Sequence, residues 1–92
     1  MIYEWNPEKA KSNLAKHNVS FEEASTVFAD PLSETFDDPD HSEDEQRFII
    51  IGHSDNERLL FISHADDGEK VRIISAREVT RAERKQYEQG FE

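Results

Sequence analysis

The sequence predicts an α+β fold, in which an antiparallel sheet of four to five strands packs with two N-terminal helices and one C-terminal helix. Three observations support this fold class. Two segments with helix-capping residues occupy the first third of the chain. Three strand-like segments then follow one another through short polar turns between residues 47 and 76. A highly charged segment from about residue 78 to residue 87 has the composition of a surface helix.

Length and composition narrow the class of protein. The chain has 92 residues, 35% of them hydrophobic and 35% charged, which is typical of one water-soluble domain spanning residues 1–92. It has no cysteine, so no disulfide framework or thiolate chemistry is expected. No apolar run is long enough to cross a bilayer, and the N-terminus lacks the features of a signal peptide. We therefore expect a cytoplasmic protein.

The first elements can be placed from local signals. Residues 1–5 alternate in the manner of a short strand. Asn6 is a favourable N-cap before Pro7, which suits the first position of a helix. This helix is expected to carry Leu14 on its apolar side and to end at Asn18, a residue common in left-handed caps.

The second helix begins at Ser20 and has a capping-box pattern. Ser20 and Glu23 stand in the reciprocal positions of that motif. Phe21 and Phe28 recur at helical spacing and predict an apolar face, and the helix is expected to stop at Asp30-Pro31.

An acidic segment without aliphatic residues follows, from residue 37 to residue 45. It is expected to be a solvated loop or a frayed hairpin. Its acids and histidine superficially resemble metal ligands: Asp37, Asp38, Asp40, His41, Glu43, Asp44 and Glu45. Their spacing matches no calcium-binding loop, so neither a metal nor a cofactor is expected.

Three strands are predicted at residues 47–53, 58–64 and 71–76, joined by hairpin turns. With Asp55-Asn56 and Asp67-Gly68 at the centres of the turns, His64 lies opposite both Arg47 and Val71. Arg47 and His64 would then share one face of the sheet, whereas Arg72 would point to the other. A slip of one residue would exchange these faces.

The charge distribution indicates where a ligand binds. The net charge is −10, which argues against nucleic acid as a ligand for the chain as a whole. The acids, however, gather between residues 20 and 47, and bases gather between residues 70 and 87. Arg77, Arg81 and Arg84 are spaced to share one face of the predicted C-terminal helix, and this local basic stripe favours an anionic ligand.

Several segments resemble the BrnT family of bacterial toxins along essentially the whole chain. The most specific are the segments 16–21 (Lys-His-Asn-Val-Ser-Phe) and 72–77 (Arg-Ile-Ile-Ser-Ala-Arg). Further similar segments are Tyr3-Glu4-Trp5-Asn6, Lys11–Leu14, Val27–Pro31 and Glu83-Arg84 with Tyr87. Two features depart from the family pattern: Asn18 stands where glycine is commoner, and the net charge is low for a toxin that cuts RNA.

The resemblance implies a ribonuclease toxin of a type II toxin–antitoxin pair, with a RelE-like fold whose open sheet face meets RNA. Such a toxin stops translation. It is neutralised by a co-encoded antitoxin, expected here to be a ribbon-helix-helix protein, and the complex meets operator DNA only through that antitoxin.

Candidate site residues follow from the chemistry of RNA cleavage, which needs an acid, a base and cations at the phosphate. His64 is the candidate acid or base because the ordinary pKa of histidine is near neutral. Arg72 and Arg77 are candidate phosphate clamps, because a guanidinium holds two oxygens at once. The candidate catalytic residues are His64, Arg72, Arg77, Arg84 and Tyr87. The candidate RNA-binding residues are Lys11, Lys16, Arg47, Lys70 and Arg81.

Plainer interpretations stay open for several of these residues. Arg77 and Arg84 are equally consistent with ion pairs to glutamates of the last helix, such as Glu83. Tyr87 is also consistent with a packing role, and His64 with a histidine at the edge of the sheet. For the whole chain, the alternative is a partner-binding or regulatory module that keeps the fold and cleaves nothing.

Overall fold

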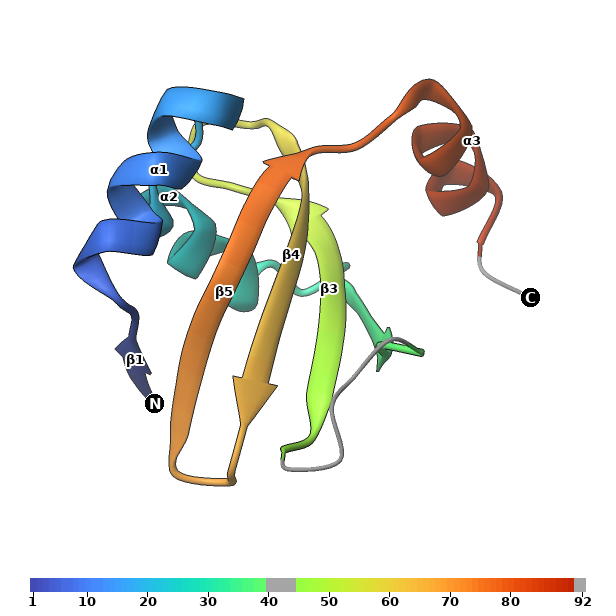
Figure 1. Ribbon diagram of the computed structural model, residues 1–92. Coiled ribbons are helices and arrows are strands. Elements are labelled where there is room, and N and C mark those ends of the chain that lie inside the picture. The colour runs from blue at the N-terminus through green and yellow to red at the C-terminus, as the bar shows by residue number, and fades with distance from the viewer. Residues whose placement is uncertain (40–44, 91–92) are drawn as a thin grey trace.

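The computed structural model describes residues 1–39 and 45–90 and shows a mixed α+β fold (Figure 1). Its elements are β1 (Ile2–Glu4), α1 (Pro7–His17), α2 (Phe21–Thr26), the 3₁₀ turn η1 (Val27–Ala29), β2 (Glu34–Asp37), β3 (Arg47–His53), β4 (Leu59–Asp66), β5 (Lys70–Glu78) and α3 (Arg81–Gln89). The predicted order of elements and the α+β class are confirmed. The acidic residues 40–44 lie outside the described residues, so the prediction for that loop is not tested.

The five strands form one sheet in the order β1-β5-β4-β3-β2. Strands β2 to β5 pair antiparallel, as predicted. Strand β1 instead pairs parallel to β5, with Tyr3 beside Val71. The predicted all-antiparallel sheet is therefore wrong at this edge, where β1 pairs with the last strand of the chain and not with the strand that follows it in sequence.

The predicted register between β3 and β4 is also wrong, by one residue. His53 pairs with Leu59, where Arg58 was expected. Glu57 adopts a left-handed backbone, with φ 60°, and lengthens the turn beyond the two central residues that were predicted. Because side chains alternate across a strand, this extra residue moves His64 to the opposite face from the one expected.

Helices α1 and α2 cover one face of the sheet, and α3 lies beyond the other face (Figure 1). The main core lies under α1 and α2. It contains Val19, Phe21, Ala24, Val27, Ile50, Leu60, Ile62, Val71, Ile73 and Ala76, with Tyr3, Trp5, Ala10 and Phe28 packed against it. Trp5 meets Phe21 edge to face, as a core anchor would.

Helix α1 is attached to the sheet by a polar residue. Leu14, expected on the apolar side, is 49% exposed, whereas Asn13 is buried. The Asn13 amide donates to the carbonyls of Val19 (2.9 Å) and Ala76 (2.8 Å), and its oxygen accepts from the Ala76 N–H at 3.1 Å. The cap predicted at Asn18 is confirmed by its left-handed backbone.

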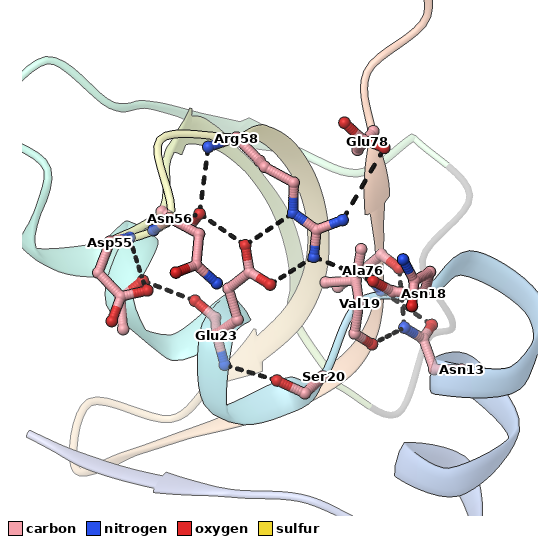
Figure 2. Close-up of polar contacts among 12 residues, drawn as sticks. Asn13, Asn18, Val19, Ser20, Glu23, Asp55, Asn56, Arg58, Ala76 and Glu78 are labelled. Atoms are coloured by element: carbon pink, nitrogen blue, oxygen red, sulfur yellow. Dashed lines mark hydrogen bonds and ion pairs between the residues drawn. The ribbon is translucent and has the colours of Figure 1, made fainter.

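A second polar cluster joins α2 to the β3–β4 turn (Figure 2). The side chain of Arg58 donates through its Nε (2.9 Å) and through a second nitrogen to the Glu23 carboxylate, and it also donates to the carbonyl of Asn18. Ser54 donates to the same carboxylate at 2.7 Å. Glu23 is thus diverted from the predicted capping box, although Ser20 does accept from the Glu23 N–H.

Helix α3 begins later than predicted. Thr80 is its N-cap and forms a reciprocal capping box with Glu83. Arg77 therefore lies in β5, not on the helix, and does not share a helix face with Arg81 and Arg84 as the spacing suggested. No helix in the described part of the chain has both the length and the apolar character that a membrane span requires.

Candidate functional site

The sheet face opposite α1 and α2, together with α3 beside it, carries most of the residues predicted to act on RNA, and we call this sheet face the open face. Its apolar centre consists of Ile49, Ile51 and Leu59, with Phe36, Phe61, Val79 and Tyr87 packed against them. Arg72 and Arg77 both project from β5 onto this face, because Arg72 pairs with Ala65 and Arg77 with Phe61. They are five positions apart, which is about 16 Å along a strand.

One end of the open face is a basic cluster that is neutralised in part. Arg72 is joined to the Glu45 carboxylate, and Arg47 reaches the same group through Nε at 3.2 Å. The Arg72 hydrogen bond holds the pKa of Glu45 below its ordinary value. Lys70 lines the adjoining pocket of about 340 Å³ together with Arg72. Arg47 and Arg72 share this face, contrary to the predicted register.

The other end of the open face is built around Arg77. Its guanidinium lies over the Phe61 ring, 4.1 Å from the ring centroid. Two of its nitrogens donate to the two oxygens of Glu83, at 2.8 and 3.0 Å. This pair confirms the plainer interpretation of Arg77 as an ion-paired residue. It also shows that the guanidinium is oriented to hold two oxygens of an anion.

A histidine, a tyrosine and an aspartate meet beside this end. The rings of His53 and Tyr87 lie 6.1 Å apart, and the His53 side chain is 48% exposed. Asp30 accepts from the His53 N–H at 2.7 Å, and its carboxylate lies 3.8 Å from the ring Nδ1. Tyr87 donates to the Leu32 carbonyl at 2.9 Å. An exposed imidazole with an aspartate behind it can exchange a proton with a bound ligand.

Two groups beside the His53 imidazole, Asp30 and Tyr87, have shifted pKa values. Burial raises the pKa of Asp30, but the N–H groups of His53 and Leu32 outweigh it, so the net pKa is lowered and the group stays anionic. Burial, with the charges of Asp30 and Glu34, raises the pKa of Tyr87. At neutral pH Tyr87 is therefore a proton or hydrogen-bond donor, not a base.

A pocket of about 500 Å³ lies at the Arg77 end, between the sheet and α3. Residues of β2, β3 and β4 line it from the sheet, and residues of α3 line it from the helix. They are Glu34, Thr35, Phe36, Ile51, Phe61, Glu83 and Gln86.

Comparison with known proteins identifies the family. Residues 5–83 match the model of the BrnT ribonuclease toxin of type II toxin–antitoxin systems. The chain belongs to the BrnT family. The crystal structure of the Brucella abortus ribonuclease toxin BrnT has the same fold, with a TM-score of 0.66 and 20% sequence identity, covering 88% of this chain and all of that one. No curated protein matches the sequence.

In this BrnT chain the placement predicted for His64 is wrong. His64 lies under the helices, 2% exposed, where its ring stacks on Phe48 and meets Phe28 edge to face. Its Nδ1 is buried and has no hydrogen-bond partner among the described residues. Desolvation lowers the pKa of His64, so the ring is neutral at pH 7. A ligand on the open face does not reach it.

The remaining predicted residues are divided between the two sides of the BrnT sheet. Lys11 and Lys16 are exposed on α1, on the helix side, away from Arg72 and Arg77. Arg81 and Arg84 are exposed on α3, near the open face. The structure thus brings together Arg47, Lys70 and Arg72 at one end and Arg77 with Tyr87 at the other.

The sequence analysis missed His53, which is the exposed histidine of the open face. Its position at the end of β3 could have indicated this, because His53 alternates onto the same face of the strand as Ile49 and Ile51. Within residues 1–39 and 45–90, no three acidic or histidine side chains gather in a group that could hold a metal ion. The metal-like acids of residues 40–44 lie outside the described part of the chain.

Proposed function

We propose that this chain is an endoribonuclease toxin that cuts RNA on the open face by metal-independent acid–base chemistry and so inhibits translation. The observation that carries the proposal is the placement of Arg77, His53 and Tyr87 at one end of that face in a member of the BrnT family. Because its substrate is cellular RNA, the proposed place of action is the cytoplasm.

In the proposed reaction the ribose 2′-OH attacks the adjacent phosphate, and the bond to the 5′-oxygen breaks. His53 takes the 2′-OH proton, and the Asp30 carboxylate lies 3.8 Å from its Nδ1. Arg77 leaves Glu83 for two phosphate oxygens and stabilises the charge that develops on them. Tyr87, protonated at neutral pH, donates to the leaving oxygen. The products are a 2′,3′-cyclic phosphate and a 5′-hydroxyl.

The other basic residues extend the proposed RNA site. Arg72, Arg47 and Lys70 hold the backbone further along the open face, and Arg81 and Arg84 approach it from α3. Lys11 and Lys16 are on the other side of the sheet, so in this proposal they contact RNA only where the strand passes round the edge. His64 has no part in the chemistry.

The proposed partner is a co-encoded antitoxin, of ribbon-helix-helix type, that silences the toxin by covering the open face. An amphipathic helix with acidic residues would fit the apolar centre and the basic ends together. Binding should slow amide hydrogen exchange in residues 70–87. Protection limited to the helix side of the sheet would contradict this placement. In this proposal the toxin–antitoxin complex binds operator DNA only through the antitoxin.

One observation favours the alternative of a partner-binding module that cleaves nothing. Both candidate clamps are already paired with carboxylates, Arg72 with Glu45 and Arg77 with Glu83. In a chain of net charge −10, RNA must displace these acids before it can bind.

Cleavage of end-labelled RNA in EDTA distinguishes the two functions. We expect cyclic-phosphate ends, a loss of about 10²-fold or more in His53→Ala, and a loss of about 10²- to 10³-fold in Arg77→Ala. His17→Ala and Lys9→Ala, both on the helix side, are the matched controls and should cut as the wild type does. In cells, expression without antitoxin should arrest growth, and Arg72→Ala or Arg77→Ala should relieve the arrest. Cutting that requires magnesium and leaves 5′-phosphates would refute the mechanism.

A further inference from the structure

The pocket between β2 and α3 has a chemistry that differs from the rest of the open face. No lysine or arginine lines it. Its charged lining residues are Glu34 and Glu83, and the others are apolar, aromatic or neutral. Glu83 is paired with Arg77, whereas Glu34 would repel a phosphate placed in the pocket. The pocket therefore suits an uncharged group with hydrogen-bond donors, not the RNA backbone.

The shape of the pocket suits a flat ring. Ile51 in β3 pairs with Glu34 on one side and with Phe61 on the other, and Phe36 lies two residues further along β2 on the same face. Gln86 and Glu83 of α3 line its helix side. The volume of about 500 Å³ lies within the range of roughly 300–1,000 Å³ that is usual for small-ligand sites. Aromatic side chains of this kind are the common platforms on which unpaired RNA bases stack.

Glu34 supplies the polar group that selects among such rings. The side chain of Glu83 is held by Arg77 and by the Thr80 N–H. Glu34, in contrast, is exposed, and no hydrogen bond or ion pair engages its carboxylate within residues 1–39 and 45–90. It lies on the same row of the sheet as Ile51, Phe61 and Arg77, so it faces the pocket directly.

We propose that this pocket binds one unpaired guanine of the RNA substrate. Guanine presents two adjacent donors, N1–H and the N2 amino group, which match the two oxygens of the Glu34 carboxylate. Adenine presents an acceptor at N1, and uracil places carbonyls on both sides of its single donor, so a carboxylate repels both. The base lies between Phe36 and the Phe61–Arg77 pair.

The position of Arg77 connects this base site to the cleavage site. Its guanidinium lies over Phe61, which lines the pocket, and its partner Glu83 also lines the pocket. A phosphate next to the bound base would meet Arg77 while the base occupies the pocket. The inference rests on the proposed ribonuclease function, and it adds that cleavage occurs next to guanine.

The test uses RNA pentamers of uridine with one central guanine, inosine or adenine, all with 2′-O-methyl riboses that prevent cleavage. Fluorescence anisotropy at fixed salt gives each Kd. The wild type should bind the guanine pentamer roughly ten-fold or more tightly than the adenine pentamer, since a good bidentate contact discriminates by about that factor. Inosine, which lacks the N2 amino group, should fall between them.

Two variants locate the effect in the pocket. Glu34→Gln should abolish the preference for guanine, whereas Glu22→Gln, the same change of charge on the helix side, should leave it intact. Phe36→Ala should weaken binding of all three pentamers, because stacking acts on every base. Thermal melting confirms that each variant is folded.

Each outcome decides between the two proposals. The proposal that the pocket binds guanine is refuted if the wild type binds the guanine and adenine pentamers equally, or if Glu34→Gln keeps the preference for guanine. A Glu34→Gln variant that binds RNA normally but loses affinity for the antitoxin also refutes it, because the pocket is then a protein-docking site. Cleavage of unmodified RNA is measured in parallel. Selective binding of guanine without cleavage would refute the nuclease function and support the guanine pocket. Cleavage without a preference for guanine would support the nuclease function and refute the guanine pocket.

Discussion

Removing Arg58 should destabilise the fold strongly, because it leaves the Glu23 carboxylate buried without its cation. The Glu23 side chain is 8% exposed and accepts from Arg58 and from Ser54. Breaking a buried ion pair by removing one partner costs about 3–5 kcal/mol. The Arg58 side chain is itself 25% exposed, so water can replace part of it, and we take the lower value of about 3 kcal/mol for Arg58→Ala.

The assay is urea unfolding and thermal melting of Arg58→Ala beside Arg84→Ala, which truncates an exposed arginine on α3. A loss of about 3 kcal/mol corresponds to a fall in Tm of roughly 12–24 °C for a domain of this size. The control should change by less than about 0.5 kcal/mol. The double variant Arg58→Ala/Glu23→Leu should recover part of the loss, because it removes the unpaired charge.

The pH dependence tests the cause of this loss. In the wild type the Arg58 hydrogen bond lowers the pKa of Glu23, so its contribution to stability is present above pH 4.5 and is lost as the pH falls through the lowered value. Without Arg58 the largest cause of the lowering is lost and burial opposes only the bonds from Ser54 and Asn56, so the pKa of Glu23 is higher in Arg58→Ala than in the wild type. The difference in stability between wild type and Arg58→Ala should therefore shrink between pH 7 and pH 4. A difference that stays constant, or a loss below about 1 kcal/mol at pH 7, would refute the reasoning.

Three further predictions concern other residues. His64→Leu should flatten the stability curve below about pH 6.5, because the lowered pKa of the buried ring makes acid destabilise the wild type; chemical unfolding across pH checks this. Asn13→Ala should cost at least about 2 kcal/mol, because three buried backbone groups lose their partner, whereas the exposed Ser12→Ala should cost little; urea unfolding of both variants is the measurement. Glu45→Gln should tighten RNA binding and steepen its salt dependence by freeing Arg72 and Arg47, and an unchanged Kd would contradict this.

Local sequence signals predicted the element order because each depends on neighbouring residues. Asn6 with Pro7, Ser20 before α2 and Asn18 after α1 all occupy the cap positions expected of them. The Thr80–Glu83 box was present in the sequence by the same pattern. The predicted start of the last helix followed the arginine spacing instead, and it was too early.

The sheet register could not be predicted in the same way. Glu57 carries no side-chain signal for a left-handed backbone, yet it decides which face His64 occupies. The parallel pairing of β1 with β5 joins residues far apart in the chain and also has no local signal. Candidate residues that depended on the register were therefore misplaced, as with His64 and Arg47. Arg72 and Arg77 were recognised by composition and resemblance instead, and both lie on the open face.

The pairing of Arg77 with a carboxylate suggests how an acidic chain can still bind RNA. Glu83 presents two oxygens to two nitrogens of Arg77, which is the geometry that a phosphate would present. The carboxylate thus keeps the guanidinium in the orientation needed for RNA. In the exchange of one anion for the other, two charge-assisted bonds are broken and two of the same geometry form, and the Arg77 side chain, 34% exposed, is accessible to the phosphate. In the proposed mechanism the net charge of −10 therefore does not prevent catalysis; it lowers the affinity for RNA and leaves the choice of substrate to contacts with the base.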